Sequence, residues 1–65
     1  MWIVMHIARG KALCDRLVSL LEADGILVNV KPTYKNMPES QNDYQIRVLK
    51  SEAEQARSVL IKNGF

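Results

Sequence analysis

The chain has only one cysteine, Cys14, among its 65 residues. A single thiol can neither close an internal disulfide nor complete a cysteine-based zinc site. The lack of disulfides is typical of a reducing compartment, so we expect a cytoplasmic protein. No apolar run reaches the length of about 20 residues that a membrane-spanning helix needs. The opening MWIVMHIA lacks the basic leading segment of a signal peptide and contains His6, so it predicts a strand, and no membrane association is expected.

An excess of charge of one sign is missing too. Nine Lys and Arg residues stand against seven Asp and Glu residues, which gives a formal net charge of +2. The basic residues are dispersed, so composition does not predict nucleic acid as the partner. Hydrophobic residues make up 48% of the chain and charged residues 25%, which is ordinary for a folded domain. A chain of this length forms one domain, residues 1–65.

Three short apolar runs are present, and each alternates in a way that suits a strand. They predict strands at residues 2–7, 26–31 and 44–49. Pro32 ends the second of them, because proline cannot donate a hydrogen bond to a sheet. The polar segment 33–42 contains a further proline and predicts a mobile loop.

Two helical patterns separate and follow these runs. The first begins near Gly10 and ends at Gly25, a residue that can adopt the left-handed conformation of a helix end. Its inward side is marked by leucines at the helical period: Leu13, Leu17, Leu20 and Leu21. The second is introduced by Ser51 and Glu54, which are spaced as a capping box. Its inward residues are Ala53, Ala56 and Leu60.

The order of elements is therefore β-α-β-β-α, which favours an α+β fold. A right-handed crossover joins the first two strands in parallel, and the third strand returns between them. The prediction is a ferredoxin-like sandwich without its fourth strand, with a three-stranded antiparallel sheet in the order 1-3-2 and two helices on one face. Strand one then has an unpaired edge, and the other face of the sheet stays open.

The open face is the best candidate for an interaction surface. Successive strand residues point to opposite sides, and Ile3, Met5 and Ile7 form the uniformly apolar set that is expected to face the core. The residues predicted on the open face are Trp2, Val4, His6, Leu27, Asn29, Gln45, Arg47 and Leu49. Trp and Arg are common anchors of protein interfaces. A two-fold dimer through this face, or through the edge of strand one, is one expected assembly, and contact with another protein is the other.

A weaker candidate is an anion site at the turn from the first strand into the first helix. Its residues are Arg9, Gly10, Lys11 and, from the loop, Lys35. Free backbone N–H groups at a helix start can bind anions. The alternative is a solvated helix start, since the turn lacks most of the phosphate-binding loop pattern.

No catalytic, cofactor-binding or metal-binding set is predicted. Strand parity places His6 on the open face and Cys14 on the buried side of a helix, so the two are not expected to meet. The acidic residues show no metal-ligand spacing, and the carboxylates near Ser51 suit a helix start. An enzyme is the least favoured class.

The stretch MWIVMHIARGKALCDRLVSLLEADGILVNV, together with SEAEQARSVL, resembles a family of small bacterial domains of unknown function described as prokaryotic signal-transducing proteins. The family is similar in topology to PII-type nitrogen-regulatory proteins, in which the loop between strands two and three contacts partners. The resemblance implies a regulatory module that acts by protein–protein contact, with residues 33–42 as the corresponding loop. Binding of single-stranded RNA, or of a small anionic ligand, remains the alternative.

Overall fold

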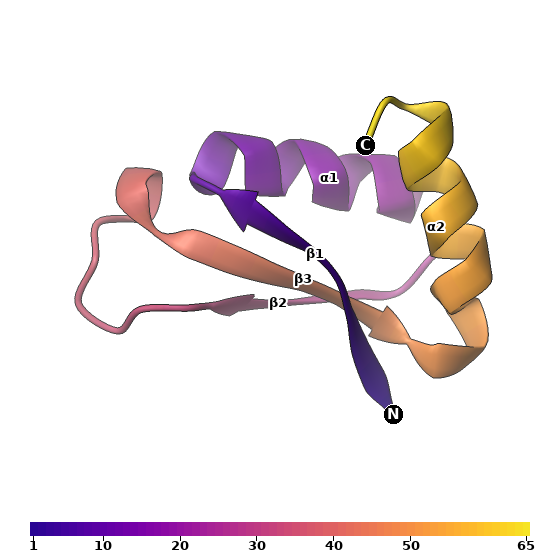
Figure 1. The fold of residues 1–65 in the computed structure, drawn as a ribbon, viewed down its shortest axis with the longest axis horizontal. Coiled ribbons are helices and arrows are strands. Elements are labelled where there is room, and N and C mark those ends of the chain that lie inside the picture. The colour runs from indigo at the N-terminus through magenta and orange to yellow at the C-terminus, as the bar shows by residue number, and fades with distance from the viewer.

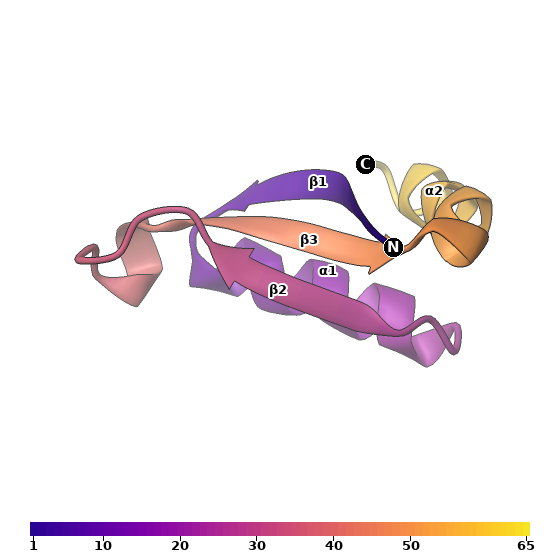
Figure 2. The same ribbon diagram turned by 90° about the horizontal axis from the view of Figure 1, so that it is seen from below.

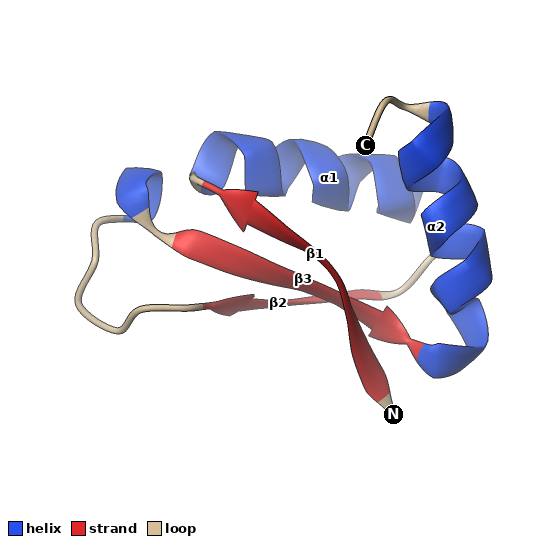
Figure 3. Cartoon of the chain, viewed as in Figure 1, coloured by secondary structure: helices blue, strands red, loops and turns tan.

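The computed structural model describes residues 1–65 and has the predicted order of elements (Figure 1). Two short 3-10 turns, η1 and η2, flank the third strand (Figure 3). The elements are β1 Trp2–Arg9, α1 Lys11–Ala23, β2 Val28–Pro32, η1 Glu39–Gln41, β3 Asp43–Leu49, η2 Lys50–Glu52 and α2 Ala53–Lys62.

The three strands form one sheet in the order β1-β3-β2, and both pairings are antiparallel. In Figure 2, α1 runs behind the sheet and α2 stands beyond the end of β3, so α1 covers one face and leaves the other open. The predicted fold, a β-α-β-β-α domain with a 1-3-2 sheet, is confirmed. Neither helix is long and apolar enough to cross a membrane.

The core lies between the covered face of β3 and the two helices. Leu17 and Leu21 of α1, and Ile46 and Val48 of β3, are fully buried. Around them are the other buried hydrophobic residues: Ala8, Cys14, Ile26, Tyr44, Ala56 and Leu60. The small Ala56 lets α2 lie close to the sheet, as its helical spacing predicts.

The end of α1 is set by Gly25, whose φ is 80°. The N–H of Gly25 donates to the carbonyl of Glu22 (2.9 Å), and the N–H of Ile26 donates to the carbonyl of Leu21 (3.1 Å). This pair of bonds is a Schellman motif, which needs a residue in the left-handed region. It turns the chain so that Ile26 packs in the core beside Leu21.

The end of α2 uses the same device. Gly64 has a φ of 86°, and its N–H donates to the carbonyl of Ile61 (3.1 Å). The N–H of Phe65 donates to the carbonyl of Leu60 (2.8 Å), so the chain folds back over the helix. The consequence is that the Phe65 ring lies beside β1.

The predicted capping box at the start of α2 is wrong. Ser51 lies inside the turn η2, and no side chain caps the helix. The helix instead continues from this turn through the N–H of Ala53, which donates to the carbonyl of Lys50. A 3-10 turn of this kind gives a backbone N–H at the helix start a carbonyl partner, so that N–H needs no side-chain cap.

A β-bulge in β1 changes which side chains face the helices. Val4 lies opposite Arg47 and His6 lies opposite Ile46, so Met5 is an extra residue in the ladder. One extra residue reverses the alternation of everything after it. The predicted positions of His6 and Ile7 are therefore wrong: His6 faces the helices, and Ile7 lies on the open face with 56% of its surface exposed.

The second strand also begins later than predicted. Ile26 belongs to the helix end, and Leu27 lies in the connection with 58% of its surface exposed. Leu27 thus flanks the sheet and is not part of it. Pro32 is the last residue of β2 and not the residue after it.

Candidate functional site

The open face brings together six of the eight residues predicted for it, all except His6 and Leu27. Trp2 lies opposite Leu49, and Val4 lies opposite Arg47, which in turn lies opposite Asn29 on β2. Trp2 is 40% exposed and Val4 is 46% exposed, although both are large apolar side chains. The register of the sheet therefore makes one continuous surface from three segments that are far apart in the sequence.

Arg47 is held in place on this face by Asn29. Its Nε donates to Asn29 Oδ1 at 3.1 Å, and its Nη2 donates to the same oxygen. The guanidinium keeps further N–H groups free for a partner, because no carboxylate pairs with it. A side chain that is already ordered loses less conformational entropy on binding.

Ile7 is a member of the open face that sequence reasoning missed. The bulge at Met5 places Ile7 opposite Gln45, with Lys31 on the far side of Gln45. Trp2, Val4 and Ile7 then form an apolar row along β1, whereas the β2 side of the face is polar. The same phase buries Ala8 completely.

The two edges of the sheet differ. Pro32 has no N–H, and Lys31 beside it is charged, and both features discourage pairing at the edge of β2. β1 is longer and contains no proline or lysine, and no other strand pairs with its outer edge. The bulge at Met5 interrupts that edge.

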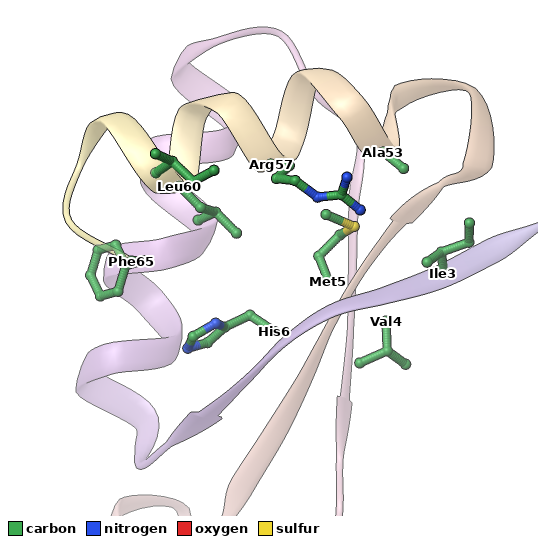
Figure 4. Close-up of a pocket in the computed structure, with 9 residues that line it drawn as sticks. Ile3, Val4, Met5, His6, Ala53, Arg57, Leu60 and Phe65 are labelled. Carbon is green, nitrogen blue, oxygen red and sulfur yellow. The ribbon is translucent and has the colours of Figure 1, made fainter.

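A cleft of about 270 Å³ lies between β1 and α2 (Figure 4). Seven of its nine lining residues are hydrophobic, and the other two are His6 and Arg57. Arg57 carries a permanent positive charge. Arg57 extends from α2 toward Met5, while the side chain of Val4 points to the opposite side of β1 (Figure 4). At one end, the rings of His6 and Phe65 meet edge to face, with centroids 6.1 Å apart.

Phe65 is also contacted from its other side. The guanidinium carbon of Arg16 lies 5.4 Å from the centroid of the Phe65 ring, a cation–π distance. The wall of the cleft that Phe65 forms is thus fixed from α1 as well as from α2. This cleft was not predicted, because it joins residues from both ends of the chain.

Two of the four residues predicted for the anion site already have partners within the protein. Lys11 Nζ bonds to Asp15 Oδ1 at 2.6 Å, and this hydrogen bond raises the pKa of Lys11. The N–H of Gly10 donates to the carbonyl of Asn42 (2.8 Å). Arg9 lies opposite Asp43 on β3, without an ion pair between them. Lys35 stands in the exposed part of the loop. The solvated helix start is the reading that these contacts favour.

Residues 33–42 return to the start of α1. Asn42 is buried, and its side chain accepts from the N–H of Tyr34 (3.1 Å) and donates to the carbonyl of Tyr34 (2.8 Å). Tyr44 Oη donates to the carbonyl of Glu39 (2.9 Å). The base of the loop is therefore tied down, and only its tip lacks such contacts.

The bulge brings His6 to the same side of the sheet as Cys14, contrary to the predicted separation, but no hydrogen bond joins them. Burial raises the pKa of the Cys14 thiol, which keeps it protonated and unreactive. No three His, Cys, Asp or Glu side chains lie close enough together to hold a metal ion.

The fold and these surfaces define a class: a small α+β domain with one open sheet face, two sheet edges, of which that of β1 lacks proline and lysine, and an apolar cleft beside β1. Comparisons of the chain with protein-family models, with curated proteins and with solved structures find no match.

Proposed function

We propose that this protein is a non-enzymatic, cytosolic interaction module of the regulatory or signal-transducing kind, and that it self-associates through the open face of its sheet. The observation that carries the proposal is the apolar row of Trp2, Val4 and Ile7 on that face. A partner that covered this row would remove large apolar side chains from water, which is the main driving force for association.

The composition of the face supports a protein partner. Trp2 and Arg47 are of two residue types, tryptophan and arginine, that are enriched at interface hot spots. Because Asn29 already orders the guanidinium of Arg47, little further ordering is needed on contact.

A back-to-back arrangement of two sheet faces fits better than an edge-to-edge one. The bulge at Met5 limits an uninterrupted ladder between two copies of β1 to Trp2, Ile3 and Val4. Two open faces, in contrast, can place the same patch of each copy against the other, as a two-fold axis requires.

The size of the chain sets the expected strength of this dimer. The accessible surface is 4493 Å², and a standard interface takes about 800 Å² from each partner, which is nearly a fifth of that surface. One sheet face can supply at most about this much. We therefore expect dissociation constants in the micromolar range, about 1 to 100 µM.

Sedimentation equilibrium of three proteins tests the proposal. Val4→Lys places a charge in the apolar row and is expected to give a monomer, while the wild type forms a dimer at tens of micromolar. Leu27→Lys is the matched control: Leu27 is also aliphatic and exposed, but it lies beyond the strand on the β2 side, so this variant is expected to remain a dimer. A monomeric wild type would remove the proposal.

Binding of single-stranded RNA is the second candidate. The observation that favours it is that Trp2 shares the open face with Arg9, Lys31 and Arg47. Bases stack on exposed aromatic side chains of open sheets, and cations contact the phosphates. A labelled oligonucleotide whose binding weakens as salt is raised would select this candidate over self-association.

A further inference from the structure

The outer edge of β1 carries backbone groups without partners in the sheet. Lys50 N–H donates to the carbonyl of Met1 (2.9 Å) at one end of the β1–β3 ladder, and Gly10 N–H donates to Asn42 at the other. Hydrogen-bonded and non-bonded pairs alternate along an antiparallel ladder. The N–H and C=O groups of Trp2 and Val4 therefore face away from β3.

The cleft between β1 and α2 opens beside this stretch of edge. Its volume is about 270 Å³. Pockets for drug-sized ligands are larger, with volumes of about 300 to 1,000 Å³. The cleft is large enough for one or two amino-acid side chains. Ile61 of α2 lines the cleft, and 65% of its surface is exposed to solvent. The cleft thus has an aliphatic side chain at its exposed rim.

The cleft is lined by a positive charge and by no acidic side chain. Arg57 has no carboxylate partner, since the one ion pair of the protein is Lys11 with Asp15. No acidic residue lines the cleft, and Arg16 adds a second positive charge behind Phe65. An occupant that complements the cleft is apolar and carries a carboxylate.

We infer that the cleft and the adjoining edge of β1 form a groove for an extended peptide, which adds as a strand beside Trp2 and Val4. One apolar side chain of the peptide enters the cleft against Met5, and one acidic side chain meets Arg57. Strand addition gains affinity from main-chain hydrogen bonds and specificity from pockets for alternate side chains.

The geometry of a strand fixes the pattern of that peptide. Alternate side chains of an added strand point to the same side and lie about 7 Å apart. The apolar and acidic residues therefore stand two positions apart, and the residue between them points to the open face. Val4 borders the cleft, but its side chain points to the opposite side of β1 (Figure 4), so the side-chain pocket of the groove and the apolar row of the open face lie on opposite sides of the strand.

Fluorescence polarisation with labelled synthetic peptides tests the inference. The first peptide, TVTLTETV, places Leu and Glu on one side of the strand. The matched peptide, TVTLETTV, has the same composition and charge but moves Glu to the opposite side. We expect the first to bind about three- to tenfold more tightly, as one charge-assisted hydrogen bond allows. Equal affinities, or no binding of either peptide, would overturn the inference.

Two variants assign the carboxylate contact. Arg57→Gln is expected to abolish the preference for TVTLTETV, and Lys62→Gln, which removes an exposed charge of α2 outside the cleft, is expected to keep it. Both positions are exposed, so matching urea midpoints with the wild type are expected and check that each variant is folded. A preference that survives Arg57→Gln would contradict the assignment.

Amide hydrogen exchange of the complex locates the peptide. Protection is expected to increase at Trp2 and Val4 and to stay unchanged at Val30 on the opposite edge. Protection at Val30 alone, or a wild type in which a second copy already protects Trp2 and Val4, would contradict the groove. Repeating the titration with Ile7→Lys, which changes a residue of the apolar row that does not line the cleft, separates the two proposals, because loss of self-association with retained peptide binding is the expected result.

Discussion

Replacing Ile7 by alanine tests the bulge in β1, on which the composition of the open face depends. In the structure Ile7 is 56% exposed, whereas Ile46 of β3 is completely buried. Truncating a fully buried isoleucine to alanine costs about 2 to 5 kcal/mol of unfolding free energy. Ile7→Ala removes a side chain that is less than half buried, so its cost is expected to be about 1 kcal/mol or less.

The matched variant is Ile46→Ala, which makes the same chemical change and is expected to show the full cost. With a urea dependence of about 1 kcal/mol per molar for a small domain, its midpoint falls by about 2 M or more, and that of Ile7→Ala by less than about 1 M. Far-UV circular dichroism during urea unfolding measures both. A strand without the bulge would bury Ile7, so equal losses in the two variants would refute the bulge and return His6 to the open face.

Other substitutions and one exchange measurement test the rest of the fold. Leu17→Ala is expected to lower the unfolding free energy by about 2 to 5 kcal/mol, because Leu17 is fully buried, and an unchanged urea midpoint would place α1 in a different rotation. Gly25→Ala is expected to cost about 1 to 2 kcal/mol from its positive φ alone. Gly10→Ala is expected to cost more in the same urea assay, because its φ is also positive and an added Cβ would lie 3.2 Å from the carbonyl oxygen of Ser40; equal costs would contradict that contact. In amide exchange, residues 35–37 are expected to exchange fastest within the loop, since their N–H groups donate no hydrogen bond, and slow exchange there would contradict a mobile loop tip.

The topology could be predicted because several local signals agree. The helix end after α1 needs a residue with positive φ, and Gly25 supplies it. The leucines of α1 recur at a single period. The return of β3 between β1 and β2 is the split form of the β-α-β unit, which the order of elements favours. These features depend on neighbours in sequence, which a pattern can reveal.

The phase of β1 depended on contacts that a pattern does not reveal. Ile3, Met5 and Ile7 are equally apolar, so alternation alone cannot tell a regular strand from one with an extra residue at Met5. The decision comes from Ala8, which is completely buried, and from the pairing of His6 with Ile46. Both are tertiary relations.

The start of α2 and the cleft were missed for a related reason. Ser51 and Glu54 have the spacing of a capping box, but the backbone turn η2 satisfies the helix start without either side chain. The cleft joins β1 with Arg57 and Phe65 at the other end of the chain. Phe65 reaches it through the hydrogen bond that its N–H donates to Leu60, which only the folded helix end provides.

The emission of Trp2, measured as a function of protein concentration, tests the central claim most directly. Trp2 is the only tryptophan, it lies on the open face, and 40% of its surface is exposed. If two open faces come together, its emission maximum is expected to shift to shorter wavelength as the concentration rises from about 1 to 200 µM. Val4→Lys is expected to remove the shift and Leu27→Lys to retain it. An emission maximum that stays constant for the wild type over this range would contradict self-association through the face that carries Trp2.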